Sequence, residues 1–98
     1  MKDEDKNTHS FKELADQLLN SPGFKARYTA ARVKESWRSL MADNAMHYTS
    51  GLRYHKGILY VHITSAALRD ELNRGKSLII DLINKDLGEQ ILKDIRFL

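Results

Sequence analysis

The sequence contains no cysteine, a single proline and no stretch long and apolar enough to span a membrane. Without cysteine, disulfides, thiolate zinc sites and cysteine nucleophiles are all excluded. The apolar stretch Leu78-Ile-Ile80 is ended by Asp81, and the first ten residues, MKDEDKNTHS, are polar or charged apart from Met1. We therefore expect neither a membrane span nor a signal peptide, and a cytoplasmic location.

The sequence also lacks any recognisable arrangement of catalytic residues. The sequence shows no nucleophile paired with a base, no phosphate-binding glycine loop and no pair of carboxylates at a plausible site. His47, His55 and His62 match no zinc-ligand spacing. We therefore predict a protein that is not an enzyme and that has no metal, cofactor or small-molecule substrate.

The residues that are present are typical of one soluble folded domain. Hydrophobic residues make up 42% and charged residues 30% of the 98 residues. Lysine and arginine number 16 against 13 aspartates and glutamates, which gives a formal net charge of +3. This surplus permits contact with nucleic acid without requiring it.

The N-terminal half predicts a tail followed by two helices. Residues 1–9 have no apolar periodicity and are expected to be a mobile tail, so that a single domain covers residues 10–98. Ser10 and Glu13 form a capping box at the start of a helix over residues 10–20. The segment Asn20-Ser-Pro-Gly23 marks a break or a fresh helix start. A second helix then extends from Phe24 to about residue 45, with Trp37 in the core.

Residues 51–63, GLRYHKGILYVHI, predict a β-hairpin with a two-residue turn at Lys56-Gly57. By alternation, the core face carries Leu52, Tyr54, Leu59, Val61 and Ile63. The other face carries His47, Thr49, Gly51, Arg53, His55, Ile58, Tyr60 and His62. In this register Arg53 lies opposite Tyr60.

The C-terminal part predicts a long helix and a third strand. Thr64 or Ser65 caps the helix, which ends at Leu87-Gly88 and contains Gly75 as a point where it kinks or splits. Residues 93–98 alternate as a strand, and Arg96 joins the open face if this strand joins the hairpin. The order α-α-β-β-α-β indicates an α+β domain in which helices cover one face of a three-stranded sheet.

Two groups of side chains are candidates for binding. The candidates for nucleic acid are Arg27, Arg32, Lys34 and Arg38 on the second helix and Arg53, Tyr60 and Arg96 on the open sheet face. The candidates for a partner protein are Arg53, Tyr60 and His62. Aromatic and arginine side chains stack on bases or hold phosphates, but an ordinary solvated surface explains either group as well.

An ordered set of residues over positions 24–98 resembles the bacterial DciA family, also known as domain of unknown function 721. The set is a tryptophan in a helix, Tyr48-Thr49 and a hairpin, then Gly57-x-Leu59-x-Val61-x-x-Thr64-Ser65, Glu71-Leu72, Ile83-Asn84, Leu87-Gly88 and Ile95-x-Phe97. The resemblance implies a KH-like fold and a non-enzymatic accessory protein. The resemblance further implies association with the replicative DNA helicase. The small positive surplus and the lack of a base-reading motif predict weak DNA binding without sequence preference.

The sequence departs from this pattern in ways that affect binding. It has Ala42 where the family usually has glycine, and it lacks the Gly-x-x-Gly loop on which true KH domains rely. Some family members carry a basic, flexible C-terminal extension, whereas this sequence ends at the third predicted strand. If that extension supplies DNA or helicase contacts in relatives, we expect the folded domain or a partner to supply them here. A KH-like RNA-binding or ribosome-associated module is the alternative, and the sequence does not distinguish DNA from RNA.

Overall fold

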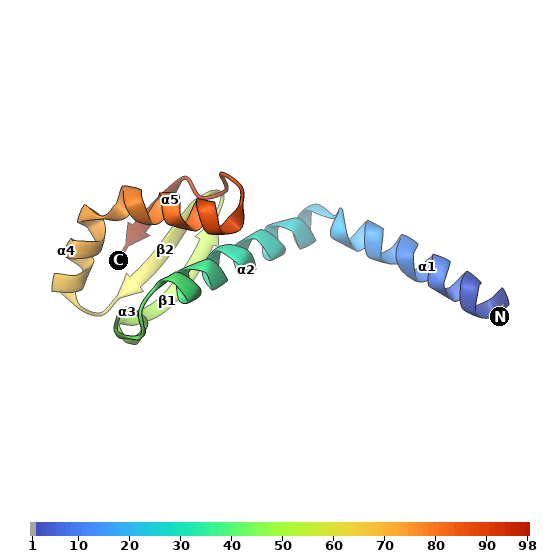
Figure 1. The fold of residues 1–98 in the computed structure, drawn as a ribbon, viewed down its shortest axis with the longest axis horizontal. Coiled ribbons are helices and arrows are strands. Elements are labelled where there is room, and N and C mark those ends of the chain that lie inside the picture. The colour runs from blue at the N-terminus through green and yellow to red at the C-terminus, as the bar shows by residue number, and fades with distance from the viewer. Residues whose placement is uncertain (1) are drawn as a thin grey trace.

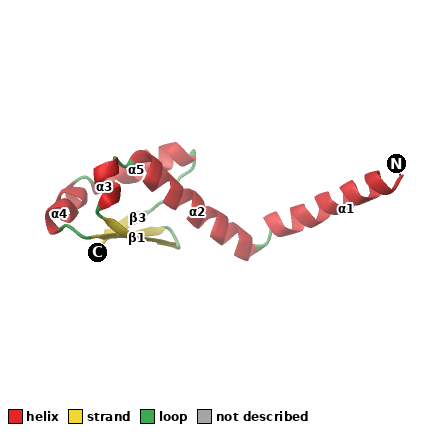
Figure 2. Ribbon diagram, turned by 90° about the horizontal axis from the view of Figure 1, so that it is seen from below, coloured by secondary structure: helices red, strands yellow, loops and turns green. Residues whose placement is uncertain are grey.

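The computed structural model describes residues 2–98, with side chains from Ser10 onward. The elements follow one another as α1 (Lys2–Leu19), α2 (Pro22–Leu40), α3 (Asp43–His47), β1 (Thr49–His55), β2 (Ile58–Ile63), α4 (Ala66–Arg74), α5 (Lys76–Leu87) and β3 (Asp94–Phe97) (Figure 1). In the sheet, β2 is central, antiparallel to β1 and parallel to β3. Helices cover one face of this sheet and leave the other open (Figure 2). The predicted α+β arrangement is therefore confirmed.

Helix α1 begins earlier than the capping pattern predicts. The predicted start at Ser10 is wrong, because the helix begins at Lys2 and Ser10 lies inside it. No glycine or proline precedes Ser10, so nothing in the sequence interrupts the helical backbone there. Met1 lies outside the described residues, and the mobility predicted for residues 1–9 stays a prediction.

The joint between α1 and α2 is built by short polar side chains. Ser21 accepts a hydrogen bond at Oγ from the Phe24 N–H over 3.2 Å and donates one to the Leu18 carbonyl over 2.9 Å. Pro22 occupies the start of α2, where its missing N–H has no helical partner to lose. The segment is thus the fresh helix start that the sequence allows, and α1 extends from it away from the domain (Figure 1).

The end of α2 differs from the prediction. The helix was expected to reach about residue 45, but it ends at Leu40. Met41 (φ −85°, ψ 141°) and Ala42 (φ −67°, ψ 157°) have extended backbones, and the short helix α3 starts anew at Asp43. An acidic residue in a first helical turn is favoured by the helix dipole, which supports this new start.

The hairpin has the predicted register. Leu52 pairs with Val61, Arg53 with Tyr60 and Tyr54 with Leu59. The turn residues Lys56 (φ 47°) and Gly57 (φ 85°) both have the positive φ of the expected turn. The face of the sheet is therefore set by simple alternation from Gly51 to Ile63.

The start of β1 differs, and two residues leave the predicted open face. The register shifts between Thr49 and Gly51, so that Thr49 pairs with Ile63. The Thr49 hydroxyl donates to the Ala45 carbonyl over 2.9 Å. His47 lies in α3, where its ring meets that of Tyr48 edge-on. A bulge of one residue reverses the face of the strand residues before it, which explains the error at Thr49. The error at His47 arises because this residue is helical and outside the sheet.

The predicted long helix is split at Gly75. The Ser65 Oγ caps α4 by accepting from the Leu68 N–H over 3.2 Å, and Gly88 (φ 75°) ends α5 in the left-handed conformation. Both caps agree with the prediction.

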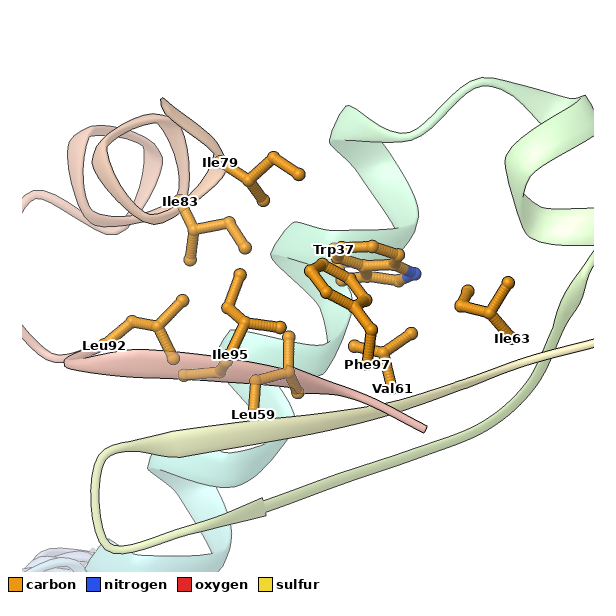
Figure 3. Packing of buried hydrophobic residues seen from close by; sticks show 10 residues of the cluster. Trp37, Leu59, Val61, Ile63, Ile79, Ile83, Leu92, Ile95 and Phe97 are labelled. Atoms are coloured by element: carbon orange, nitrogen blue, oxygen red, sulfur yellow. The ribbon is translucent and has the colours of Figure 1, made fainter. Parts of the chain in front are cut away.

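One apolar core lies between the helices and the sheet. Its buried members are Val33, Trp37, Leu59, Val61, Ile63, Ile79, Ile83, Leu92, Ile95 and Phe97 (Figure 3). The Trp37 and Phe97 rings lie 6.0 Å apart, and Leu72 packs against the cluster while partly exposed. Trp37, Leu59, Val61 and Ile63, which the sequence predicts for the core, all belong to this cluster.

Candidate functional site

A row of three side chains crosses the open face of the sheet. Tyr60, on the central strand β2, pairs with Arg53 on β1 and with Arg96 on β3. Its chain neighbours Leu59 and Val61 are buried under the helices, so alternation turns Tyr60 to the opposite face. The Cζ atoms of Arg53 and Arg96 lie 4.6 Å and 5.9 Å from the Tyr60 ring centroid. We call this arrangement the Arg53–Tyr60–Arg96 row.

The two guanidiniums of the row are available to a ligand. Arg53 and Arg96 are exposed, and among residues 10–98 neither one forms a hydrogen bond or an ion pair. Arg74, by contrast, is paired with Glu71. The aromatic ring holds the two positive charges side by side by cation–π attraction, while their N–H groups stay free for phosphate or carboxylate oxygens.

His62 lies on one side of the row, and Asp94, whose carboxylate is neutralised by an ion pair, lies on the other. His62 is exposed and pairs with Gly51, where a Cβ would approach the imidazole Cδ2 to 3.3 Å. The absence of a side chain at position 51 therefore leaves room for this ring. On the other side, the Asp94 Oδ1 lies 3.3 Å from the Lys76 Nζ. The face consequently keeps a positive character.

The predicted residues on α2 do not form one surface. Arg32 donates to the Leu87 carbonyl over 2.7 Å and to Glu89 over 3.0 Å, so it holds the C-terminal end of α5. Arg27, Lys34 and Arg38 recur at seven and four residues, which places them on one side of the helix. Of these, Arg38 is paired with Glu35 over 3.6 Å. We therefore assign Arg32 a structural role and treat the other three as a separate basic stripe.

Asn84 is a structurally important residue that the sequence reasoning missed. It is buried, and its side-chain amide donates to the Leu92 carbonyl over 2.8 Å. Its Oδ1 accepts from the N–H groups of Ile91 and Leu92. These bonds fix the segment that leads into β3 and thus the position of Arg96. The available signal was a polar residue directly after Ile83 on a buried helix face.

His47 lies on α3, apart from His55 and His62 on the sheet, and residues 10–98 contain no group of three histidine, aspartate or glutamate side chains arranged to hold a metal ion. Among the described helices, none combines the length and the apolar character required to cross a membrane.

The fold and the row define a small α+β domain with a helix-covered sheet and an uncovered face that carries arginine and tyrosine. The family model described as Dna[CI] antecedent, DciA, matches residues 10–97, and the chain belongs to this family. Membership implies an accessory role of the helicase-loader type in DNA replication. Neither a curated protein nor a solved structure matches the chain.

Proposed function

We propose that this protein is a non-enzymatic accessory factor that binds the replicative DNA helicase and holds single-stranded DNA on the open face of its sheet. The observation that carries the DNA contact is the Arg53–Tyr60–Arg96 row, with two guanidiniums that have no acceptor among residues 10–98. Family membership supports the helicase as the partner.

The row supplies the two interactions that single strands require. Guanidinium N–H groups bind phosphate oxygens in a charge-assisted manner. The flat guanidinium of Arg53, lying over the Tyr60 ring, offers a base a stacking surface. Stacking of one base is worth about 1–3 kcal/mol, and every base has a π-face. Binding is therefore weak and independent of sequence.

The direct test measures fluorescence anisotropy of a labelled single-stranded oligonucleotide across a salt series. The double variant Arg53→Ala with Tyr60→Ala is expected to bind several-fold more weakly than the parent. Its salt dependence becomes shallower by about 0.7 in the log–log slope, the value for one lost phosphate contact on a single strand. Arg74→Ala is the matched control, because it removes one arginine from α4 and leaves the row intact.

Two outcomes would contradict the DNA contact. If the double variant binds like the parent, the open face is idle. If it loses binding because it unfolds, seen as a lowered melting temperature, the row is structural. Tighter binding of RNA than of DNA of the same length would instead favour the RNA-binding alternative.

The helicase partnership needs a separate experiment. Co-purification with the tagged protein from its native host is expected to recover the replicative helicase. Recovery of ribosomal proteins without the helicase would contradict the proposal and identify the alternative module.

A further inference from the structure

Helix α1 carries an apolar stripe that the domain does not cover. Phe11, Leu14 and Leu18 recur at intervals of three and four residues, and Ala15 completes the same side of the helix. The exposed fractions of Phe11 and Leu18 are 72% and 54%. Both ribbon views show α1 extending from the joint into solvent, away from the sheet and its helices (Figures 1 and 2).

Such a helix is unfavourable on its own. Most of the stability of a helix in a protein comes from packing of its apolar face, and the 18-residue α1 leaves that face exposed. Large apolar side chains grouped on one exposed side mark an interaction surface. A partner surface that covers the stripe would stabilise the helix as well as hold the partner.

We propose that the partner is a second copy of this chain, whose α1 pairs with the first in antiparallel orientation. The stripe is complementary to itself, because a two-fold axis between Leu14 and Ala15 places Phe11 of one copy against Leu18 of the other. Spacings of three and four residues are those of a coiled-coil seam. The small side chain of Ala15 lets the two helices approach closely at the axis.

The distribution of charge between α1 and the domain supplies an attraction that helps this pairing. The sequence of α1 contains five carboxylates and three lysines, a net charge of −2, which leaves +5 on residues 20–98. Antiparallel pairing carries each α1 past the partner's joint to the end of the domain that holds Lys25, Arg27 and Lys56. Lys25 and Lys56 line one hollow there, of about 360 Å³. An acidic helix therefore meets a basic surface, an attraction that salt weakens.

The stripe consists of Phe11, Leu14, Ala15 and Leu18, against about 20–30 residues a side in a standard stable interface, so the dimer is weak and depends on concentration. Sedimentation equilibrium of the full chain is expected to show a mass that rises toward twice the monomer mass as the concentration increases. The double variant Leu14→Glu with Leu18→Glu is expected to stay monomeric throughout. Gln17→Glu adds a negative charge beside the stripe and is the control, expected to dimerise like the parent.

Single thiols test the orientation, since the chain has no cysteine of its own. Ala15→Cys lies at the proposed axis and is expected to be joined efficiently by a short bifunctional thiol reagent. Asp16→Cys faces away from the stripe and is expected to be joined at least tenfold less. Equal joining of the two thiols would contradict the antiparallel arrangement.

Other results overturn the inference outright. A parent chain that stays monomeric at the highest concentration excludes the dimer, and so does a Leu14→Glu, Leu18→Glu variant that dimerises like the parent. If the parent is monomeric and this variant loses the helicase, α1 docks on the helicase and not on a second copy. Binding of single-stranded DNA by the open face is expected to survive in the variant, so the two proposals fail independently.

Discussion

Trp37 joins the helical layer to the sheet through packing alone. Its side chain is completely buried beside Phe97, and its indole Nε1 has no hydrogen-bond partner among the described residues. Trp37→Ala is expected to lower the free energy of unfolding by about 3–5 kcal/mol, because it removes a large apolar group and leaves a cavity. Urea denaturation measures this, with exposed Tyr28→Ala as the smaller reference loss. A change no larger than that reference would contradict the placement of Trp37.

Asn84 stabilises the fold through hydrogen bonds, whereas Trp37 does so through packing. Asn84→Ala leaves the Leu92 carbonyl and the N–H groups of Ile91 and Leu92 without their partner. Each unpaired buried group costs about 1–3 kcal/mol, so we expect a marked fall in stability. Hydrogen exchange of the Leu92 amide is expected to accelerate by more than tenfold. An unchanged exchange rate at Leu92 would show that another group holds this segment.

At the scale of elements, substitution of Gly57 and of Gly75 by alanine is expected to have opposite effects on stability. Gly57 has φ 85°, and a Cβ there would lie 2.9 Å from the Lys93 Cδ. Gly57→Ala is therefore expected to destabilise the protein by about 1 kcal/mol or more. Gly75 has φ −96° and its Cβ would meet no atom closer than 3.9 Å. Gly75→Ala is expected to be neutral or to stabilise by about 0.4–1 kcal/mol.

Thermal unfolding of the two glycine variants provides the comparison. The melting temperature is expected to fall for Gly57→Ala and to stay level or rise for Gly75→Ala. Similar losses in both variants would mean that the joint between α4 and α5 needs glycine for a reason other than its backbone angles.

Elements set by local patterns were predictable, and elements set by distant contacts were not. The hairpin follows from alternation and from one turn, so the pairing of Arg53 with Tyr60 was available in the sequence. The start of α1 and the end of α2 were missed, because no glycine or proline marks either point. The bulge before Gly51 left no signal in the pattern of alternation.

The candidate site shows the same limit. Arg96 reaches Tyr60 only because β3 pairs in parallel with β2 after two intervening helices. The prediction for Arg96 was therefore conditional on a third strand joining the sheet. Arg32 appeared to be one of a set of surface cations, and its role depends on Leu87 and Glu89, more than fifty residues away. Composition and spacing along α2 contain no information on such a partner.

At the scale of the whole molecule, charge and shape divide the protein into separate surfaces. The open sheet face holds the Arg53–Tyr60–Arg96 row, α2 holds the stripe of Arg27, Lys34 and Arg38, and α1 extends outward with an acidic sequence and an apolar stripe. Single-stranded DNA is attracted by both basic surfaces over a Debye length of about 8–10 Å. Within residues 10–98, only the row combines guanidiniums that lack a protein partner with an aromatic ring, and we therefore expect the strand to bind there.

Mapping of the backbone amides by two-dimensional NMR tests this placement most directly. Unlabelled single-stranded oligonucleotide is added to isotope-labelled protein at low salt. The largest shifts are expected at Arg53, Tyr60 and Arg96 and their strand neighbours, with small shifts at Arg27, Lys34 and Arg38 on α2. If the largest shifts occur along α2 and the sheet is undisturbed, the strand binds α2 and not the open face of the sheet.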